Sequence, residues 1–243
     1  MKIIYFLLLS GLIFAQENDL KLKINSIVDK DSIQKERIYT INYQIENLTN
    51  KPVSFFLKPN TLIANAASSM TIFPIYKLYI NNEATNFDGP FFEKDGIDWK
   101  QKLKAIKDYS SPEAKEIIQK AFAEIDASNK TIVDNYKKNG GTITDDKIIL
   151  ESNKWLTSKI TLQPNETKQF TIETYWDKER YTKQDDLEYY LNENDTYEFE
   201  LILSLQKDNL RMKIVSEEFE KITKDVTFIQ GNFISNKVAI NFK

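Results

Sequence analysis

Carboxylates are the side chains of this sequence that could carry acid–base catalysis, because the chain contains neither cysteine nor histidine. A glycan hydrolase needs two carboxyl groups that converge on one glycosidic bond. Adjacent acidic pairs occur at Asp145-Asp146, Asp185-Asp186 and Glu217-Glu218. Neighbouring residues on a strand point to opposite faces, and acidic pairs in loops are typically solvated. We therefore expect a charged surface and no catalytic residues, with a carboxylate-dependent glycan hydrolase as the alternative.

The missing residue types exclude several other chemistries. Without cysteine and histidine the chain has no disulfide, no thiol nucleophile, no Ser-His-Asp triad and no thiolate or imidazole ligand for zinc or copper. Calcium takes oxygen ligands, and residues 192–195 (Asn-Glu-Asn-Asp) are rich in oxygen, but they lack the spaced pattern of an EF-hand loop. The sequence therefore predicts no metal site and no cofactor.

Aromatic side chains form a second group with chemical potential. Phe87, Phe91, Phe92 and Trp99 lie in or beside a loop that precedes a helical stretch. Aromatic rings on loops can stack on sugars or anchor a protein partner. They can also pin an insertion to the sheet below it, which is the role that the burial tendencies of aromatic rings favour. These four residues are the candidate binding residues of the sequence, with the pinning role as the alternative.

Alternation of apolar and polar residues predicts the strands that would support such loops. We expect strands at 20–24, 39–45, 53–57, 75–80, 148–150, 155–162, 170–176, 197–205, 210–215 and 238–242. Residues 53–57 are expected to return beside 39–45 as a hairpin, and 210–215 beside 197–205. Strands with one wet face are typical of antiparallel sheets. The sequence therefore predicts a mainly β fold, an antiparallel immunoglobulin-like β-sandwich.

One stretch, at about 98–139, has the period of a helix. Ser110, Pro112 and Glu113 form a strong helix start, and Gly140-Gly141 provide a stop. Between them, apolar residues at 114, 117, 118, 121, 122 and 125 fall on one face. We predict a single domain over 16–243 that carries this segment as a helical insertion.

Two of the predicted turns resemble those of known sandwich families. Residues 41–53 resemble a hairpin of bacterial immunoglobulin-like domains, with Asn47 before a polar turn and Pro52 after it. Residues 162–177, with the run Leu-Gln-Pro-Asn-Glu-Thr, are similar to a hairpin of the intracellular proteinase inhibitor (BsuPI-like) sandwiches; Asn165 replaces the usual glycine. The resemblance implies a fold. The helical insertion and the leader described below depart from that family, so no inhibitory activity is transferred.

Residues 1–15 have the layout of a secretory signal peptide. Lys2 precedes an apolar run at 3–9, and Ala15 is the small residue before the polar Gln16. We expect cleavage between Ala15 and Gln16. The alternative, an N-terminal membrane anchor, requires about 20 apolar residues, which is more than this run provides.

Charge and composition narrow the class of partner. The formal net charge is −3, with both signs mixed and no basic stripe, so we expect no nucleic acid partner. No later apolar run could span a bilayer, so we expect no stable membrane span in the mature chain. The sequence predicts a periplasmic or secreted, non-enzymatic binding protein of the bacterial envelope, with a protein or glycan partner. An assembly subunit working by strand addition is a further alternative, and it would expose an unpaired edge strand or a groove.

Overall fold

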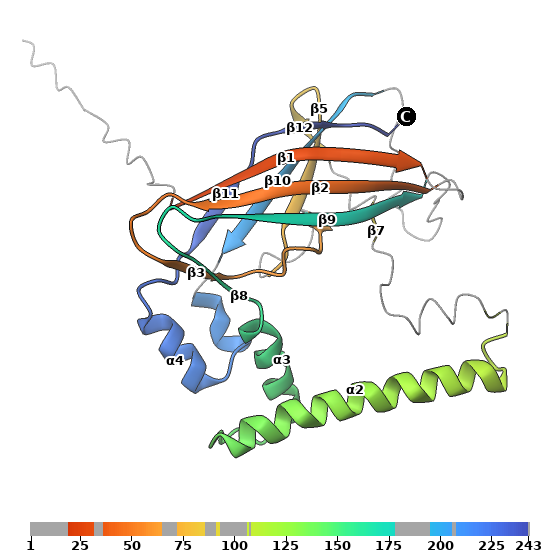
Figure 1. Cartoon of the computed structure of the whole chain (residues 1–243), viewed down its shortest axis with the longest axis vertical. Helices are drawn as coiled ribbons and strands as arrows, with labels where there is room; N and C mark the ends of the chain where they lie inside the picture. The colour runs from red at the N-terminus through yellow and green to blue at the C-terminus, as the bar shows by residue number, and fades with distance from the viewer. Residues whose placement is uncertain are drawn as a thin grey trace, which may run out of the picture.

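The computed structural model describes residues 19–31, 36–64, 72–85, 91–92, 106, 108–177, 195–205 and 208–242. Within these ranges the protein is mainly β with several antiparallel sheets, as the sequence predicts (Figure 1). The strands are β1 (Leu20–Asp31), β2 (Glu36–Asn47), β3 (Val53–Phe56), β4 (Ile63–Ala64), β5 (Ile75–Ile80), β6 (Glu83–Ala84), β7 (Phe91–Phe92), β8 (Lys159–Leu162), β9 (Thr167–Asp177), β10 (Tyr197–Leu205), β11 (Gly231–Ile234) and β12 (Val238–Ile240). The helices are α2 (Pro112–Lys138), α3 (Asp146–Leu156), α4 (Ser216–Lys224) and the 3-10 helix η1 (Asp208–Met212).

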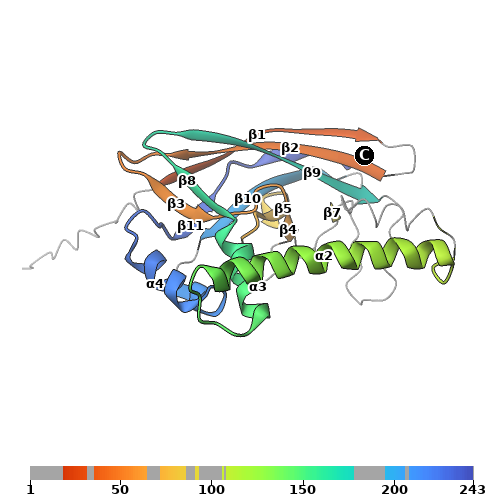
Figure 2. The same cartoon turned by 60° about the horizontal axis from the view of Figure 1, so that its bottom comes forward.

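Two sheets contain most of the strands. The first has the order β1-β2-β9-β7; the second has the order β11-β10-β5-β4, with β12 also paired to β10 and β6 to β5. Figure 2 shows β1, β2 and β9 in one layer and β10 and β11 in a second layer below it. The inward side chains of both sheets form one hydrophobic cluster, in which Tyr39, Ile41, Tyr43, Phe199 and Leu201 are fully buried. The alternation read from the sequence is therefore the alternation between this core and the outside.

The strand at 53–57 corrects one prediction. β3 does not return beside β2 as a hairpin but pairs with β8, while β2 lies between β1 and β9. The buried side chain of Asn47 donates hydrogen bonds to the carbonyls of Lys51 (2.8 Å) and Gln163 (2.9 Å), and its Oδ1 accepts from the amide of Thr49 (2.9 Å). These bonds hold the chain in a turn that leads it out of the first sheet.

A helix replaces one expected strand and the first part of another. Residues 148–150 lie within α3, and of residues 155–162 only Lys159–Leu162 form a strand, because Trp155 belongs to that helix. Asp145 caps the helix by accepting from the amide of Lys147 (2.9 Å), and Ile149, Ser152 and Trp155, three residues apart, are its buried face. A run of three apolar residues fits either period, so the local pattern at 148–150 could not distinguish strand from helix.

The long helix α2 lies where the sequence places it. Its N-cap is Ser111, whose hydroxyl accepts from the amide of Ala114, with Pro112 in the first turn. It ends at Lys138, and Gly140 follows in the left-handed region (φ 86°). Residues 98–105 lie outside the described ranges. Helical structure continues in α3 beyond the predicted stop, so the helical segment between β7 and β8 is longer than expected.

The stretch after β10 also departs from the predicted strand, because it forms a 3-10 helix and a turn that lead into α4. Residues 210–215, expected as a strand, form the end of η1 and the approach to α4, a helix that the sequence pattern did not suggest. The amide of Ile214 donates to the carbonyl of Leu210 (3.0 Å), and both side chains are buried in a small cluster with Trp155, Ile222 and Phe228. Leu210 and Ile214 are four residues apart, a helical spacing that places both side chains in this second cluster. The position beside β10 expected for residues 210–215 is occupied by β11.

Candidate functional site

A cavity of about 430 Å³ opens between the outermost strands of the two sheets. β1 is the last strand of the first sheet and β11 is the last strand of the second. The cavity is lined by Leu20, Lys21, Leu22, Leu48, Asn232, Phe233 and Ile234. Its walls are therefore two strand edges with apolar side chains around them. We refer to these seven residues as the edge cavity.

Main-chain groups of β1 point toward the edge cavity. The amide of Ile24 donates to Oδ1 of Asn236 (2.9 Å), and Nδ2 of Asn236 donates to the carbonyl of Ile24 (3.3 Å), so Ile24 directs both groups away from β2. The main-chain N–H and C=O groups of successive residues point alternately to the two sides of a strand. Those of Leu22 and Leu20 therefore point away from β2, as those of Ile24 do. No other described strand pairs with this side of β1. The N–H and C=O groups of Leu20 and Leu22 therefore have no main-chain partner among the described residues.

The opposite wall of the cavity is β11, which also directs main-chain groups away from its paired strand. The amide of Ser235 donates to the carbonyl of Leu201 in β10 (2.9 Å), so Phe233, two residues earlier, also faces β10. Alternation then directs the main-chain groups of Asn232 and Ile234 away from β10. The side chain of Ile234 is 58% exposed and that of Leu48 is 47% exposed. Two apolar side chains thus reach solvent at the mouth of a cavity bounded by strand edges.

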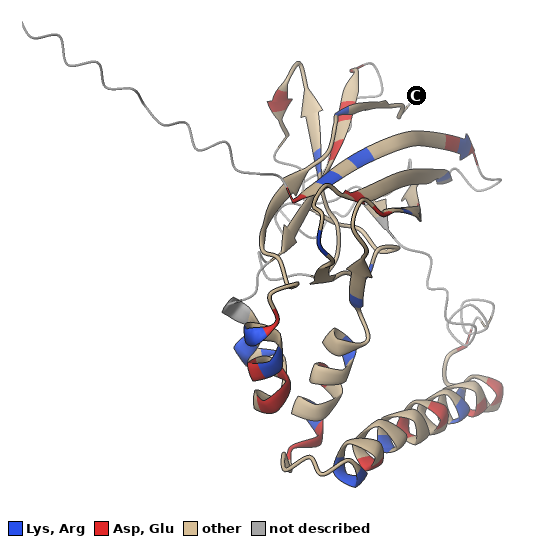
Figure 3. Ribbon diagram, turned by 60° about the vertical axis from the view of Figure 1, so that its left-hand side comes forward, with Lys and Arg blue, Asp and Glu red and all other residues tan. Residues whose placement is uncertain are grey.

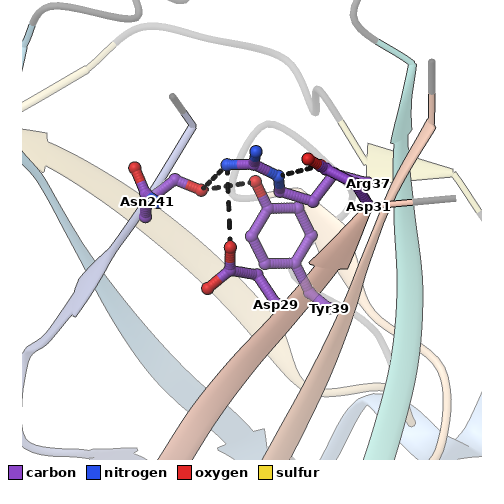
Figure 4. A network of polar contacts seen from close by, with 5 residues as sticks. All are labelled: Asp29, Asp31, Arg37, Tyr39 and Asn241. Carbon is purple, nitrogen blue, oxygen red and sulfur yellow. Dashed lines mark hydrogen bonds and ion pairs between the residues drawn. The ribbon is translucent and has the colours of Figure 1, made fainter.

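A polar network lies at the other end of β1, at Asp29 and Asp31 (Figure 4). Arg37, only 5% exposed, donates from Nε to Oδ1 of Asp31 (2.8 Å) and from Nη1 to the carbonyl of Asn241 (3.3 Å), and it forms an ion pair with Asp29 (3.6 Å). Tyr39 donates its hydroxyl proton to the same carbonyl (2.7 Å). The hydrogen bond to Asp31 raises the pKa of Arg37, and burial raises the pKa of Tyr39. Both groups therefore keep their protons and hold the C-terminal segment against β1 and β2.

The lining of the edge cavity is mostly apolar and has few ionisable groups. Its one ionisable lining residue, Lys21, forms an ion pair with Glu46 (3.7 Å) on the neighbouring strand. The remaining lining is apolar apart from Asn232 and the main-chain groups. Unpaired strand groups beside an apolar cavity can bind an extended peptide, whose main chain adds to the sheet and whose side chain fills the cavity.

The aromatic residues predicted to bind a partner are only partly within the described ranges. The ring of Phe91 packs against the rings of Tyr39, Tyr76, Phe199 and Phe242, at centroid distances of 5.4, 5.1, 6.2 and 5.8 Å. This position fits the pinning role. The main chain of Phe92 pairs with Tyr175 in β9, whereas Phe87 and Trp99 lie outside the described residues.

The acidic pairs lie in two different places. Asp145 is the cap of α3, and Asp146 forms an ion pair with Lys137 (3.0 Å) at the end of α2. Glu217 and Glu218 begin α4 and line a second cavity, between the helices. The pair at 185–186, residues 192–194 and the expected cleavage site at Ala15 and Gln16 lie outside the described ranges.

Two searches of the described residues concern metals and membranes. They contain no group of three or more histidine, cysteine, aspartate or glutamate side chains placed to hold a metal ion. Among the helices in these ranges, none combines the length and the apolar character that crossing a bilayer requires.

Comparisons with known proteins add no relative. A scan against protein-family models finds no match to this chain, and comparisons with curated proteins and with solved structures find no similar protein. The functional argument therefore depends on the residues alone.

Sequence reasoning missed the residues of the edge cavity. Leu48 is an apolar residue inside the polar turn at 47–52, which is a signal that the pattern did contain. Ile234 and Asn232 belong to a strand too short to be recognised by alternation. That Leu22 has free main-chain groups depends on which strands lie beside it, and no local pattern reports this.

Proposed function

We propose that the protein is an exported, non-enzymatic binding protein of the bacterial envelope, with an immunoglobulin-like sandwich that captures an extended segment of a protein partner by strand addition to β1. The observation that supports this proposal is the open edge at Leu20 and Leu22 beside the edge cavity. Strand addition was one of the alternatives for this sequence, and an unpaired apolar edge is the feature that it requires.

The size of the open edge and of the cavity determines how long a partner segment can be and how tightly it can bind. Leu20 and Leu22 each offer one N–H and one C=O, and each hydrogen bond that they form contributes about 1 kcal/mol net. One large apolar side chain placed against Leu48, Phe233 and Ile234 contributes about 1.5–3 kcal/mol more. The cost of ordering the peptide reduces this sum, so we expect a dissociation constant of about 0.1 to 1 mM. The partner is therefore a short extended segment with an apolar residue facing the cavity.

Titration with a synthetic peptide tests this binding mode. The probe is an acetylated heptapeptide of alternating valine and threonine, added to the isotope-labelled mature chain and followed by amide NMR. We expect the largest shifts at Leu20–Leu22 and Asn232–Ile234. Ile234→Asp should weaken binding by at least about tenfold, because it places a charge at the mouth of an apolar cavity.

Val226→Asp is the matched control for that substitution. Val226 is 84% exposed and lies outside the edge cavity, so its replacement also adds one charge at an exposed apolar position. It should leave the affinity unchanged. Equal affinities for the wild type and the Ile234 variant, or shifts that avoid Leu22, would contradict strand addition at this edge.

Export is tested separately, by the mass of the chain recovered from a secreting bacterial host. We expect a mature chain that begins at Gln16 and is found outside the cytosol. Recovery of the chain with residues 1–15 still attached, in the cytosol, would overturn the export part of the proposal.

A further inference from the structure

A second cavity of about 430 Å³ lies among the three helices, away from the edge cavity. The end of α2, one face of α3 and the start of α4 surround it, in the helical part of the molecule (Figure 3). It is lined by Ile132, Asn135, Tyr136, Asn139, Gly140, Gly141, Ile149, Ser152, Asn153, Leu156, Val215, Glu217, Glu218 and Lys221. We call it the helical groove. Its volume falls in the range of about 300–1,000 Å³ that is typical of small-molecule sites.

Two hydrogen bonds and a close glycine contact position Tyr136 in this groove. Its hydroxyl donates to Oε2 of Glu217 (3.3 Å) and accepts from the amide of Ile143 (3.3 Å). Its ring lies against Gly141 so closely that a Cβ there would come within 2.3 Å of ring carbons. Gly141, one of the two glycines that the sequence offers as a helix stop, thus also makes room for an aromatic ring.

Three uncharged amides in the groove are available to a ligand. The side chains of Asn135, Asn139 and Asn153 line the groove and form no hydrogen bond with any residue in the described ranges. Each amide group can both donate and accept. Apolar side chains lie beside them, from Ile132, Ile149, Leu156 and Val215. Such a mixture of neutral polar groups and apolar surface matches a ring with hydroxyl groups on its edge and C–H groups on its faces.

The charge of the groove selects against anions. Glu218 forms a close ion pair with Lys221 (2.6 Å), and this hydrogen bond raises the pKa of Lys221. Glu217 is bonded to two neutral hydroxyl groups, those of Tyr136 and of Thr142 (3.1 Å). Lys221 also interacts electrostatically with Glu217, but the lining has two carboxylates and one ammonium group, so its net charge is negative. The oxygens of Glu217 can still accept from ligand hydroxyls.

We propose that the helical groove is a binding site for a neutral sugar of about disaccharide size. Amides of Asn135, Asn139 and Asn153 and the carboxylate of Glu217 bond its hydroxyls, and the apolar lining contacts its C–H face. This site is independent of strand addition at β1, because the two cavities share no residue. The chain would then bind two kinds of envelope component, a peptide segment and a glycan.

Calorimetric titration with defined disaccharides tests this inference. The probes are the neutral sugars N,N′-diacetylchitobiose, cellobiose and maltose, with digalacturonate as the anionic comparison. We expect at least one neutral sugar to bind and digalacturonate to bind more weakly. Asn135→Ala should lower the affinity of the bound sugar by about tenfold, the loss of one hydrogen-bonding group to the ligand.

Asn60→Ala is the matched control, because Asn60 is an exposed asparagine outside the groove. It should leave the affinity unchanged. Asn135 is also exposed, so neither variant should alter the circular-dichroism spectrum. No heat of binding for any neutral probe at millimolar concentration, tighter binding of digalacturonate, or equal affinity of the Asn135 variant would each overturn the inference. Peptide binding at β1 would be unaffected by any of these results.

Discussion

The two ends of β1 differ in how their outer edge is treated. At the end that contains Asp29 and Asp31, a buried arginine joins the strand to the C-terminal segment. At the end that contains Leu20 and Leu22, no described strand pairs with the outer edge, and a cavity lies beside it. The same strand is therefore closed at one end and open at the other.

The difference follows from the path of the C-terminal segment. Asn236 bonds the main chain of Ile24, and Asn241 accepts from Arg37 and Tyr39, so residues 236–241 run along β1 from its middle to its end. Before Ile24 no described residue of the C-terminal segment bonds the main chain of β1. An open edge is a risk for aggregation, and proteins usually cover such an edge. Selective opening of one end is what a binding role would require.

The largest effect is expected at the closed end, for Arg37→Ala. The substitution removes a buried cation with two carboxylate partners and a bond to the carbonyl of Asn241, so it should destabilise the fold by about 3 kcal/mol. Urea denaturation measures it. Lys21→Ala, which removes an exposed ion pair at the open end, should cost less than about 1 kcal/mol. Equal costs would show that the two ends do not differ.

A smaller loss is expected at the middle of the strand, for Asn236→Ala. This change leaves the amide and the carbonyl of Ile24 without their partner and should cost about 2 kcal/mol. It also lengthens the open edge by one outward residue, so the valine–threonine heptapeptide should bind more tightly. Asn25→Ala removes only an exposed bond to Gln44 and is the control for both measurements. Weaker peptide binding by the Asn236 variant would contradict an open edge that continues past Leu22.

Tyr39→Phe is expected to have a still smaller effect, about 1 kcal/mol at neutral pH, because it removes one hydrogen bond to a carbonyl that Arg37 still contacts. Burial raises the pKa of Tyr39 above its ordinary value of 10.0. The wild type therefore keeps this contribution below pH 10 and loses it as the pH rises further, since only the unfolded chain ionises there. Urea midpoints measured from pH 8 to pH 11 should fall less steeply for the variant. An identical slope would mean that Tyr39 does not titrate on unfolding.

The smallest effect involves no substitution. In the wild type, the amide of Leu22 should exchange its hydrogen with solvent at least about tenfold faster than that of Ile24, although both side chains are buried. Hydrogen exchange followed by NMR measures both, and the bound heptapeptide should slow only Leu22. Strong protection of Leu22 in the free chain would show that its main-chain groups already have a partner.

The strongly periodic segments are the ones whose secondary structure the sequence pattern predicted. The alternation at 39–45 and 197–205 predicted β2 and β10, and the Ser-Ser-Pro start predicted α2, because burial on one face imposes its period on the residues directly. The pattern predicts strands at 148–150 and 210–215, whereas residues 148–150 lie in α3 and residues 210–215 form the end of η1 and a turn before α4. Their few apolar residues fit both periods, and the small cluster around Trp155 decided between them.

The sequence by itself determined the chemistry that is missing, the mainly β class and the longest helix, since these depend on residue types and on patterns within one segment. Tertiary structure alone decided that β3 pairs with β8, that Arg37 reaches Asn241, and that no described strand pairs with the outer edge of β1 at Leu22. Each of these relations joins residues distant in the chain, through hydrogen bonds whose partners no local period encodes. Both candidate sites arise in this second way, from the places where chain segments approach one another without closing the space between them.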